Sequence, residues 1–427
     1  MNRPDLPVSY AQDPKKRALS DIDLCVMCGL CSNTCPTYQA HRTEQESPRG
    51  RIALAKWILN EVGDLSQAAI DSLTNCLGCR ECEKSCPSLV PYHKIWSTAV
   101  AAVRQRQPHL LRKKNLLSST SEWGKGLVSM YQLSGAQWLA RKTKAVELLG
   151  LGHADRAIPQ RKGLPALAPS NPAHVTERGI VGFFVGCLSN SFDSESAHAL
   201  VRVYNRLGYR VEITKGQACC GAPLLQQGQA GEFQLRAMKN IHAFMEPSTR
   251  FQVVVGLNSG CMATLRSYYD SCIHSYQQDA LSKRAINRFH LKLTDAVDFL
   301  NRFLHWSQHS VNRLNKRVVV HQPCTSRNAL RQQEASEQLL RRIPELEILR
   351  PKASYVCCGA AGLRMLKPDQ TQIALQHRAV DSILASEPDI IVSTNIGCSM
   401  FLGSRLKELG KNIEIIHPIT LLNRQLV

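Results

Sequence analysis

Cysteine is the residue type whose spacing in this chain predicts chemistry. Two runs near the N-terminus, CVMCGLCSNTCP and CLGCRECEKSCP, share the spacing C-x2-C-x2-C-x3-C-P. Such gaps let three thiolates wrap one iron–sulfur cluster, whereas the fourth cysteine reaches the neighbouring cluster; a zinc ribbon has a different frame. The runs therefore predict two [4Fe–4S] clusters with crossed ligands: Cys25, Cys28, Cys31 and Cys86 for the first, and Cys76, Cys79, Cys82 and Cys35 for the second.

A second cysteine pattern occurs twice in the C-terminal half, around the tripeptides that begin at Cys219 and Cys357. In the two copies 31 and 32 residues separate a preceding cysteine from the first cysteine of the tripeptide, and 40 and 39 residues separate its second cysteine from a following one. The matching intervals indicate a duplicated unit with four thiols per copy. The two predicted sets are Cys187, Cys219, Cys220 and Cys261 for the first site, and Cys324, Cys357, Cys358 and Cys398 for the second.

Short strands and helices alternate around these cysteines. Apolar runs such as IVGFFVGC and RVVVHQPC are typical of strands. The segments SAHALVRVYNRLG and QIALQHRAVDSILA have the apolar spacing of helices. Alternation of this kind predicts parallel βαβ units, in which ligands bind beyond the carboxyl ends of the strands. We expect the cysteines to meet there, with Gly221 and Gly359 allowing close approach of the backbone beside a bulky ligand.

The expected fold combines α+β and α/β parts in four regions. Residues 1–100 form a mostly helical, ferredoxin-like domain for two [4Fe–4S] clusters, in which the segment RIALAKWILNEV packs the domain and does not touch a cluster. Residues 101–178 form a basic linker, helical and then proline-rich. Residues 179–312 and 313–427 form the two duplicated α/β domains.

Composition limits the class of protein. The chain has 427 residues, 17 cysteines and a net charge of +19. Its clustered cysteines favour metal ligation over disulfides, and neither a membrane-spanning run nor a secretory signal is apparent. Residues 101–178 carry 13 Lys or Arg against 4 Asp or Glu. We expect this region to meet an anionic membrane surface or an acidic partner, not nucleic acid.

Sequence motifs for catalysis are lacking. The chain has no G-x-S-x-G, no Walker A loop and no dinucleotide-binding glycine motif. Clusters ligated only by thiolates suit electron transfer better than chemistry on a substrate. No catalytic residue is therefore predicted, and no nicotinamide or flavin site is visible in the sequence.

At this point the chain resembles the iron–sulfur subunit of bacterial glycolate oxidase, in which a two-cluster ferredoxin domain precedes paired cysteine-rich CCG domains. The segments SPRGRIALAK, CLGCRECEKSCPSLVPYHK and STNIGC carry the likeness. The resemblance implies a subunit of an oxidoreductase acting on CH–OH groups with a non-NAD acceptor. FAD-containing subunits would oxidise glycolate or another 2-hydroxy acid, and this chain would pass electrons toward the membrane quinone pool. The implied location is cytoplasmic and peripheral on the inner membrane.

Other members of the wider family leave alternatives open. The chain is also similar to iron–sulfur subunits of D-lactate and anaerobic glycerol-3-phosphate dehydrogenases, and to heterodisulfide reductase, which implies thiol–disulfide chemistry at the CCG sites. In the fuller family pattern each CCG domain ends in C-x-x-C, whereas Cys261 and Cys398 here lack that second cysteine. Four thiols per site remain compatible with an additional iron–sulfur cluster, with zinc or with no metal.

Three further features have both functional and structural interpretations. His321 and His417 are candidate ligands or donors to a cluster, although a single histidine in an α/β core is more often structural. Cys272 lies outside both cysteine frames and is expected to be a buried thiol. The amphipathic segment 126–150 suits either an anionic lipid surface or a partner subunit.

Overall fold

The structure is a computed structural model that describes residues 13–112, 137, 142–143, 152–159, 165–172, 175–245, 251–271, 280–303, 311–351 and 356–427. The chain divides into two compact units. One comprises residues 1–117, 221–238 and 267–287, and the other comprises residues 118–220, 239–266 and 288–427. Cys272, most of the basic region 101–178 and nearly all of segment 126–150 lie outside the described residues.

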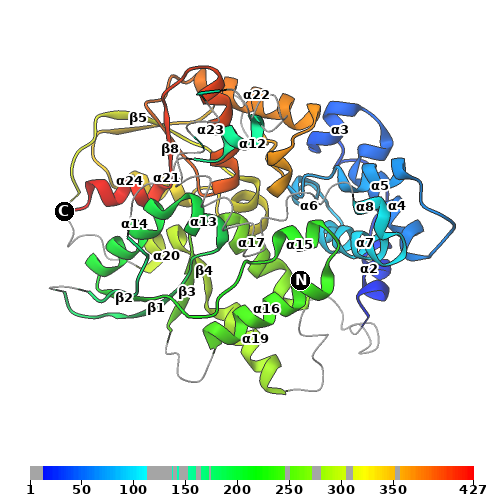
Figure 1. Cartoon of the computed structure of the whole chain (residues 1–427), viewed down its shortest axis with the longest axis horizontal. Helices are drawn as coiled ribbons and strands as arrows, with labels where there is room; N and C mark the ends of the chain where they lie inside the picture. Colours follow the sequence, from blue (N-terminus) through cyan, green and yellow to red (C-terminus); the bar gives the residue numbers. More distant parts are fainter. Residues whose placement is uncertain are drawn as a thin grey trace. The chain divides into compact units, whose positions relative to one another are not determined.

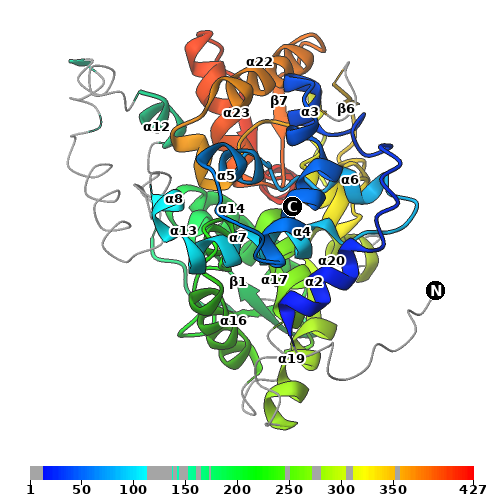
Figure 2. The same ribbon diagram turned by 90° about the vertical axis from the view of Figure 1, so that its right-hand side faces the viewer.

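The first unit is helical. Helices α2, α4, α5 and α7 pack on one another and are drawn in blue to cyan in Figure 2. Their apolar faces enclose a core that includes Ile58, Ile70, Ile95 and Val100. The helices of the N-terminal part are α2 (Pro14–Ile22), α3 (Pro36–His41), η1 (Glu44–Glu46), α4 (Pro48–Leu59), α5 (Gln67–Thr74), α6 (Glu81–Lys84), α7 (Tyr92–Arg106) and α8 (Pro108–Arg112).

Local signals explain where these helices begin. Ser47 Oγ accepts a hydrogen bond from Gly50 N at 2.9 Å and caps α4, with Pro48 in the first helical position. Ser66 caps α5 in the same way, through Ala69 N at 3.2 Å. These caps fix the start of each helix.

The second unit contains two four-stranded parallel sheets (Figure 1). The first sheet has the order β2-β1-β3-β4, and its strands are drawn in green shades. Along the chain, the elements of this repeat are β1 (Gly179–Phe184), α13 (Cys187–Phe192), α14 (Ser194–Arg206), β2 (Tyr209–Glu212), α15 (Ala222–Gln226), α16 (Ala230–Met245), β3 (Val253–Gly256), α17 (Ser259–Tyr268), η2 (Tyr269–Ser271), α19 (Ala280–Lys292), β4 (Leu293–Asp295) and α20 (Ala296–Phe303). Of these, α15, η2 and the first parts of α16 and α19 fall within the segments of the first unit.

The second sheet repeats this topology with the order β6-β5-β7-β8. Its elements are β5 (Lys316–Val320), the π-helical turn η4 (Thr325–Leu330), α21 (Ala335–Leu340), β6 (Leu346–Leu349), η5 (Gly362–Leu366), α22 (Gln370–Leu384), β7 (Ile390–Val392), α23 (Ile396–Glu408), β8 (Glu414–Ile416) and α24 (Pro418–Gln425). A short helix, α12 (Gly152–Ala157), also belongs to this unit. The predicted fold class and the duplication are confirmed.

The structure adds one strand to each predicted repeat. The strands β4 and β8 pair in parallel with β3 and β7 at one edge of each sheet. Each has three residues and mixes polar with apolar side chains, as in Leu293–Asp295 and Glu414–Ile416. Such a segment is too short to show the alternation that identifies a strand in a sequence.

The two sheets share one hydrophobic core. Leu200 and Val203 of α14 belong to the same buried cluster as Ile419 and Leu422 of α24. Helix α24, drawn in red at the C-terminus, lies beside the green helix α14 in Figure 1. Ser196 Oγ and Thr420 Oγ1 are 2.8 Å apart across this contact. The duplicated repeats are therefore packed as one body within the second unit.

The glycines of the two CCG tripeptides are required by their backbone conformation and by the side chains packed against them. Gly221 and Gly359 have φ angles of +87° and +81°, in the left-handed region. A Cβ on Gly221 would lie 2.5 Å from the Phe233 ring, and one on Gly359 would lie 2.5 Å from the Gln372 carbonyl oxygen. Both glycines are therefore required by the protein's own packing, and the expected close approach beside a ligand stays a prediction.

Candidate metal centres

The two N-terminal cysteine runs fold into loops with matching backbones. In the first loop Met27 and Gly29 have positive φ, at 55° and 80°, and in the second loop Gly78 and Arg80 do, at 65° and 61°. These are the second and fourth residues after the first cysteine of each run. Left-handed residues at alternate positions turn the chain around a centre, and the non-glycine ones cost about 1 kcal/mol or more each. The repeated strain indicates that both loops are shaped for the same kind of ligand.

The loops bring together the crossed sets of cysteines. One cavity is lined by Cys25, Cys28, Cys31 and Cys86, and another by Cys35, Cys76, Cys79 and Cys82. Cys82 also reaches the first cavity. In each set the fourth cysteine of one run joins the first three of the other, as the spacing predicts. The donor set suits a [4Fe–4S] cluster, because four thiols converge on a single space in each case.

The pKa shifts of the thiols identify the same neighbouring cysteines. Burial raises the pKa of the Cys31 thiol, and Cys25, Cys28 and Cys86 add to the increase. Burial also raises the pKa of Cys82, followed by Cys76 and, more weakly, Glu83 and Cys35. A thiol in such a place stays protonated in the bare protein, whereas bound iron stabilises its thiolate form.

Arg51 and Tyr92 are site residues that the sequence analysis missed. Arg51 is 1% exposed and lines the cavity of Cys35, Cys76, Cys79 and Cys82, and Ile52 lines the other cavity. The segment RIALAKWILNEV therefore packs the domain, as expected, and its first two residues also line the cavities. Tyr92 lines both cavities. The available signal for Arg51 was a charged residue directly before the apolar run Ile52–Ala55.

Arg51 is held by a set of buried acceptors. Its guanidinium donates to Thr37 Oγ1 at 2.9 Å, to the Glu46 carbonyl at 2.6 Å and to the Ser72 carbonyl at 2.7 Å. It also pairs with the Glu46 carboxylate. Burial opposes its charge, but Tyr92, Cys76 and Glu46 together raise the pKa of Arg51. A fixed positive charge thus lies beside the second set of cysteines.

In the C-terminal repeats, cysteines lie beyond the carboxyl ends of the strands. Cys187 begins α13 just after β1, and Cys324 precedes η4 just after β5. Cys261 and Cys398 lie in the first turns of α17 and α23, each within an Asn-x-Gly-Cys sequence. Asn395 Oδ1 accepts from Cys398 N at 3.2 Å and so fixes that turn. The predicted placement at strand ends follows from these helix starts.

The first CCG site gathers its cysteines closely. The Sγ atoms of Cys187 and Cys219 are 3.5 Å apart. Hydrogen bonds to Cys219 and Cys261, together with burial, raise the pKa of Cys220 well above its ordinary value. Cys219, Cys220 and Cys261 are buried, and Cys187 is partly exposed. All four predicted residues therefore meet in one place.

The second CCG site is tighter and includes a histidine. The Sγ atoms of Cys358 and Cys398 are 2.8 Å apart, too far for a disulfide bond of about 2.0 Å. Ligand atoms of His321, Cys358 and Cys398 all lie within 4.8 Å of one another. Burial raises the pKa of Cys324 to about 12 and that of Cys357 as well, with Cys358 as the next cause for both. The hydrogen bond between Cys358 and Cys398 lowers the pKa of Cys358.

The two candidate histidines differ in their surroundings. His417 Nε2 donates to the Leu257 carbonyl at 3.1 Å, and its Nδ1 accepts from Ile419 N at 3.2 Å. Both nitrogens serve the packing of the two repeats, so His417 is structural. His321 Nδ1 lies 3.0 Å from Ser393 Oγ. Burial lowers the pKa of His321 to about 4, which keeps the ring neutral.

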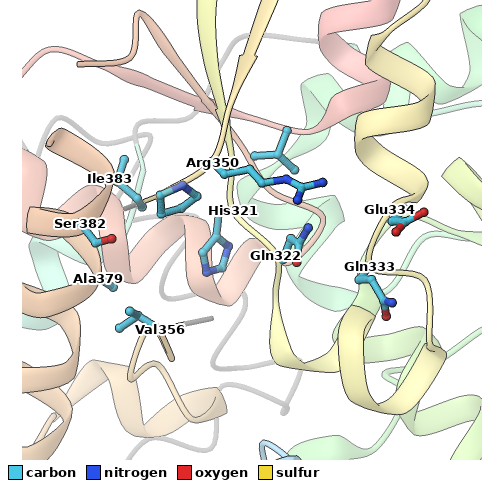
Figure 3. A pocket seen from close by; sticks show the side chains of 11 residues that line it. His321, Gln322, Gln333, Glu334, Arg350, Val356, Ala379, Ser382 and Ile383 are labelled. Atoms are coloured by element: carbon cyan, nitrogen blue, oxygen red, sulfur yellow. The ribbon is translucent and has the colours of Figure 1, made fainter. Parts of the chain in front are cut away.

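A cavity of about 140 Å³ lies next to His321. Figure 3 shows the imidazole between Ala379, Ser382 and Ile383 of α22 on one side and Gln322 on the other. Arg350 and Glu334 also line this space. Arg350 forms an ion pair with Glu337 at 2.9 Å, which holds the guanidinium at the cavity wall.

No described helix is long and apolar enough to cross a membrane. This finding applies to the described part of the chain, which contains less than half of the basic region.

Comparisons with known proteins agree with this arrangement. Residues 181–266 and 318–403 match the CCG model of a cysteine-rich domain, and residues 21–90 match the model of a 4Fe-4S dicluster domain. The probable glycolate oxidase iron-sulfur subunit of Bacillus subtilis (strain 168) is 27% identical over 424 residues, covering 93% of this chain and 92% of that protein.

Two further relatives extend the comparison. The glycolate oxidase iron-sulfur subunit of Escherichia coli (strain K12) is 28% identical over 389 residues, covering 89% of each chain. Lactate utilization protein A of Bacillus velezensis is 28% identical over 243 residues, which are 57% of this chain and 98% of that protein. The chain thus combines a 4Fe-4S dicluster domain with two CCG cysteine-rich domains, and its resemblance to the iron–sulfur subunits of glycolate oxidase is confirmed.

Proposed function

We propose that this chain is the iron–sulfur electron-transfer subunit of a glycolate or related 2-hydroxy-acid oxidase. The observation that carries the proposal is the pair of crossed cysteine sets around two separate cavities. When bound there, each [4Fe–4S] cluster accepts and donates one electron at a time. Cys25, Cys28, Cys31 and Cys86 would hold one cluster, and Cys35, Cys76, Cys79 and Cys82 the other.

The residues around the first set suit exchange of electrons with another protein. Cys28 is exposed, and the nearby side chains of Val26, Leu30 and Leu89 are 71%, 55% and 65% exposed. Exposed apolar side chains gathered around one site are typical of a surface that docks a partner. By contrast Cys35 of the second set is buried. We therefore assign the exchange with a partner to the first set.

The proposed partners follow from the chemistry that this chain lacks. FAD-containing subunits would oxidise the CH–OH group, and a quinone or another membrane acceptor would receive the electrons. The basic region 101–178 would hold the complex to an anionic surface on the cytoplasmic side of the inner membrane. High salt should then release the complex from membranes, because screening weakens attachment by charge; retention in high salt would contradict this mode of attachment.

Reconstitution tests the main proposal. The purified chain should oxidise no glycolate alone, whereas glycolate should reduce its clusters once the flavoprotein subunits are added under anaerobic conditions. A Cys79→Ala variant should leave reduction of the flavin intact and slow transfer to a quinone analogue. Glycolate oxidation by the isolated chain would overturn the assignment as a subunit.

Thiol–disulfide reduction at the CCG sites is the competing function, and the 2.8 Å contact between Cys358 and Cys398 is the observation that favours it. In that case a heterodisulfide substrate should be reduced at the expense of the reduced chain, and a Cys398→Ala variant should lose this activity. Electron transfer to quinone without any turnover of disulfides would exclude it.

A further inference from the structure

One position distinguishes the two CCG sites. In the first repeat Phe184 ends strand β1, three residues before Cys187. In the second repeat His321 follows strand β5, three residues before Cys324. The sheets have the same strand order, so these residues occupy equivalent places beside their cysteines. Both side chains are buried. The first site therefore has an apolar ring where the second has an imidazole.

The position of His321 meets the requirements of a metal ligand. Ligand atoms of one tetrahedral metal, bound at 2.0–2.3 Å, lie roughly 3.3–3.8 Å apart. The ligand atoms of His321, Cys358 and Cys398 are within 4.8 Å of one another, so small movements of the side chains bring all three onto one ion. All three residues are buried, and water does not compete strongly for these positions.

A contact with Ser393 also fixes the orientation of the His321 imidazole. Ser393 Oγ lies 3.0 Å from Nδ1, and Ser393 is anchored by its own N–H, which donates to the Ile416 carbonyl at 3.0 Å. The backbone N–H of His321 donates to the Val392 carbonyl at 2.9 Å. An imidazole that ligates a metal through one nitrogen usually bonds a second residue through the other. With Nδ1 held by Ser393, Nε2 is the nitrogen for the metal.

We propose that the second CCG site binds its metal through His321 Nε2 together with the thiolates of Cys358 and Cys398, completed by Cys324 or Cys357, whereas the first CCG site uses thiolates only. This inference rests on the proposed metal-binding role of the CCG cysteines. Mixed imidazole and thiolate ligands suit zinc and the iron of a cluster alike. Replacing one thiolate by a neutral imidazole removes one negative charge from the second site.

Metal content and X-ray absorption of the intact chain, purified without oxygen, test the proposal. Zinc at the second site should show a nitrogen neighbour at about 2.0 Å beside sulfur at about 2.3 Å. If the metal is iron in a cluster, pulsed EPR of the reduced protein should show a nitrogen coupling that changes when histidine is labelled with ¹⁵N. The two measurements separate zinc from iron.

Variants at the equivalent position sharpen the test. His321→Phe copies the residue of the first repeat and should lose the nitrogen signal together with the metal of that site. His321→Cys should keep the metal and replace nitrogen by sulfur, which distinguishes loss of a ligand from loss of folding. His417→Phe is the matched control, because it removes the other buried histidine of this repeat and should leave the nitrogen signal unchanged.

Two results would overturn the proposal: a nitrogen signal that persists in His321→Phe, or a wild-type chain with no metal beyond the two ferredoxin-type clusters. Failure of the proposed function would appear separately. It would be seen as absence of glycolate-dependent reduction of the ferredoxin-type clusters in the wild-type complex, a result that the metal analysis does not influence.

Discussion

The two N-terminal cysteine sets differ at the residue level in their exposure to water and charge. Cys28 of the first set is exposed, whereas Cys35 of the second is buried and Arg51 lies beside it. Burial lowers the reduction potential of a cluster that becomes more negative on reduction, and a nearby cation raises it. The buried arginine therefore offsets the effect of burial on the second site.

Pairs of alanine substitutions test the crossed arrangement. Cys35→Ala with Cys79→Ala removes two ligands of the same predicted cluster, so one cluster should remain. Cys35→Ala with Cys28→Ala removes one ligand from each, so both clusters should be weakened or lost. Iron analysis and EPR of the reduced variants measure the outcome. An uncrossed arrangement would reverse the two results.

Substitution of Arg51 tests its charge. Arg51→Met should lower the potential of the second cluster by on the order of tens of mV, because a nearby positive charge is removed. It should also destabilise the domain by about 3–5 kcal/mol, since Glu46 is left buried without its partner. Redox titration followed by EPR and urea unfolding measure the two effects.

A matched variant separates the charge from the packing. Arg51→Met with Glu46→Gln removes both charges and should recover much of the lost stability while the potential stays closer to that of the wild type. An unchanged potential in Arg51→Met alone would show that the arginine only packs the domain.

Among the elements, the helix starts do most to bring the cysteines together. Cys187, Cys261 and Cys398 each lie in the first turn of a helix that follows a strand. The backbone N–H groups at a helix start favour negative charge, which suits thiolates. Parallel strands place two such helix starts, those of α13 and α17, at one edge of the first sheet, and that of α23 at the matching edge of the second. The duplicated site is thus a consequence of sheet topology combined with the position of each cysteine.

Much of this arrangement could be predicted from the sequence, because cysteine spacing and alternating strands and helices are local patterns. The contributions of Arg51, Tyr92 and Ser393 could not, since each reaches the cysteines through contacts between segments distant in the chain. Strands β4 and β8 were missed because three residues give no periodic signal. His321 was recognised as a candidate, but only the fold brings it next to Cys358 and Cys398.

The contact of β8 and α24 with the first repeat is predicted to weaken in acid. Burial lowers the pKa of His417 to about 4, from an ordinary 6.5, and its Nδ1 must accept from Ile419 N. The unfolded chain takes up a proton below pH 6.5, whereas the folded one does so only near pH 4. This contribution to stability is therefore complete above pH 6.5 and is lost progressively down to pH 4, by up to about 3 kcal/mol.

Urea unfolding of His417→Gln at pH 7.5 and pH 5 measures this effect. The variant should be less stable than the wild type at pH 7.5 but should lose less stability on acidification, because glutamine does not titrate. His41→Gln, at an exposed position, is the control and should follow the wild type. An equal loss of stability in His417→Gln and the wild type would contradict the assignment.

At the scale of the whole second unit, the shared core predicts that the two CCG repeats unfold together. Buried residues of both sheets form one cluster, to which α24 contributes Ile419, Leu421 and Leu422. Arg424 also pairs with Glu195 of the first repeat at 2.8 Å. The second repeat has a further core cluster of its own, which includes Val319, Ile391 and Phe401, but loss of packing in the shared cluster must expose apolar surface of both repeats. Duplication has thus produced one cooperative body with two separate cysteine sites.

Leu422→Ala tests this cooperativity. Leu422 is fully buried, and removal of its side chain should cost about 2–5 kcal/mol. Hydrogen exchange should then speed up by a similar factor in β1 and β3 of the first repeat and in β5 and β7 of the second, although the substitution lies only in the second. Leu409→Ala, at a position 38% exposed in the same repeat, should change exchange little. If β1 and β3 kept the hydrogen-exchange protection of the wild type, the two repeats would unfold independently. The stability of each metal site would then depend on its own sheet alone.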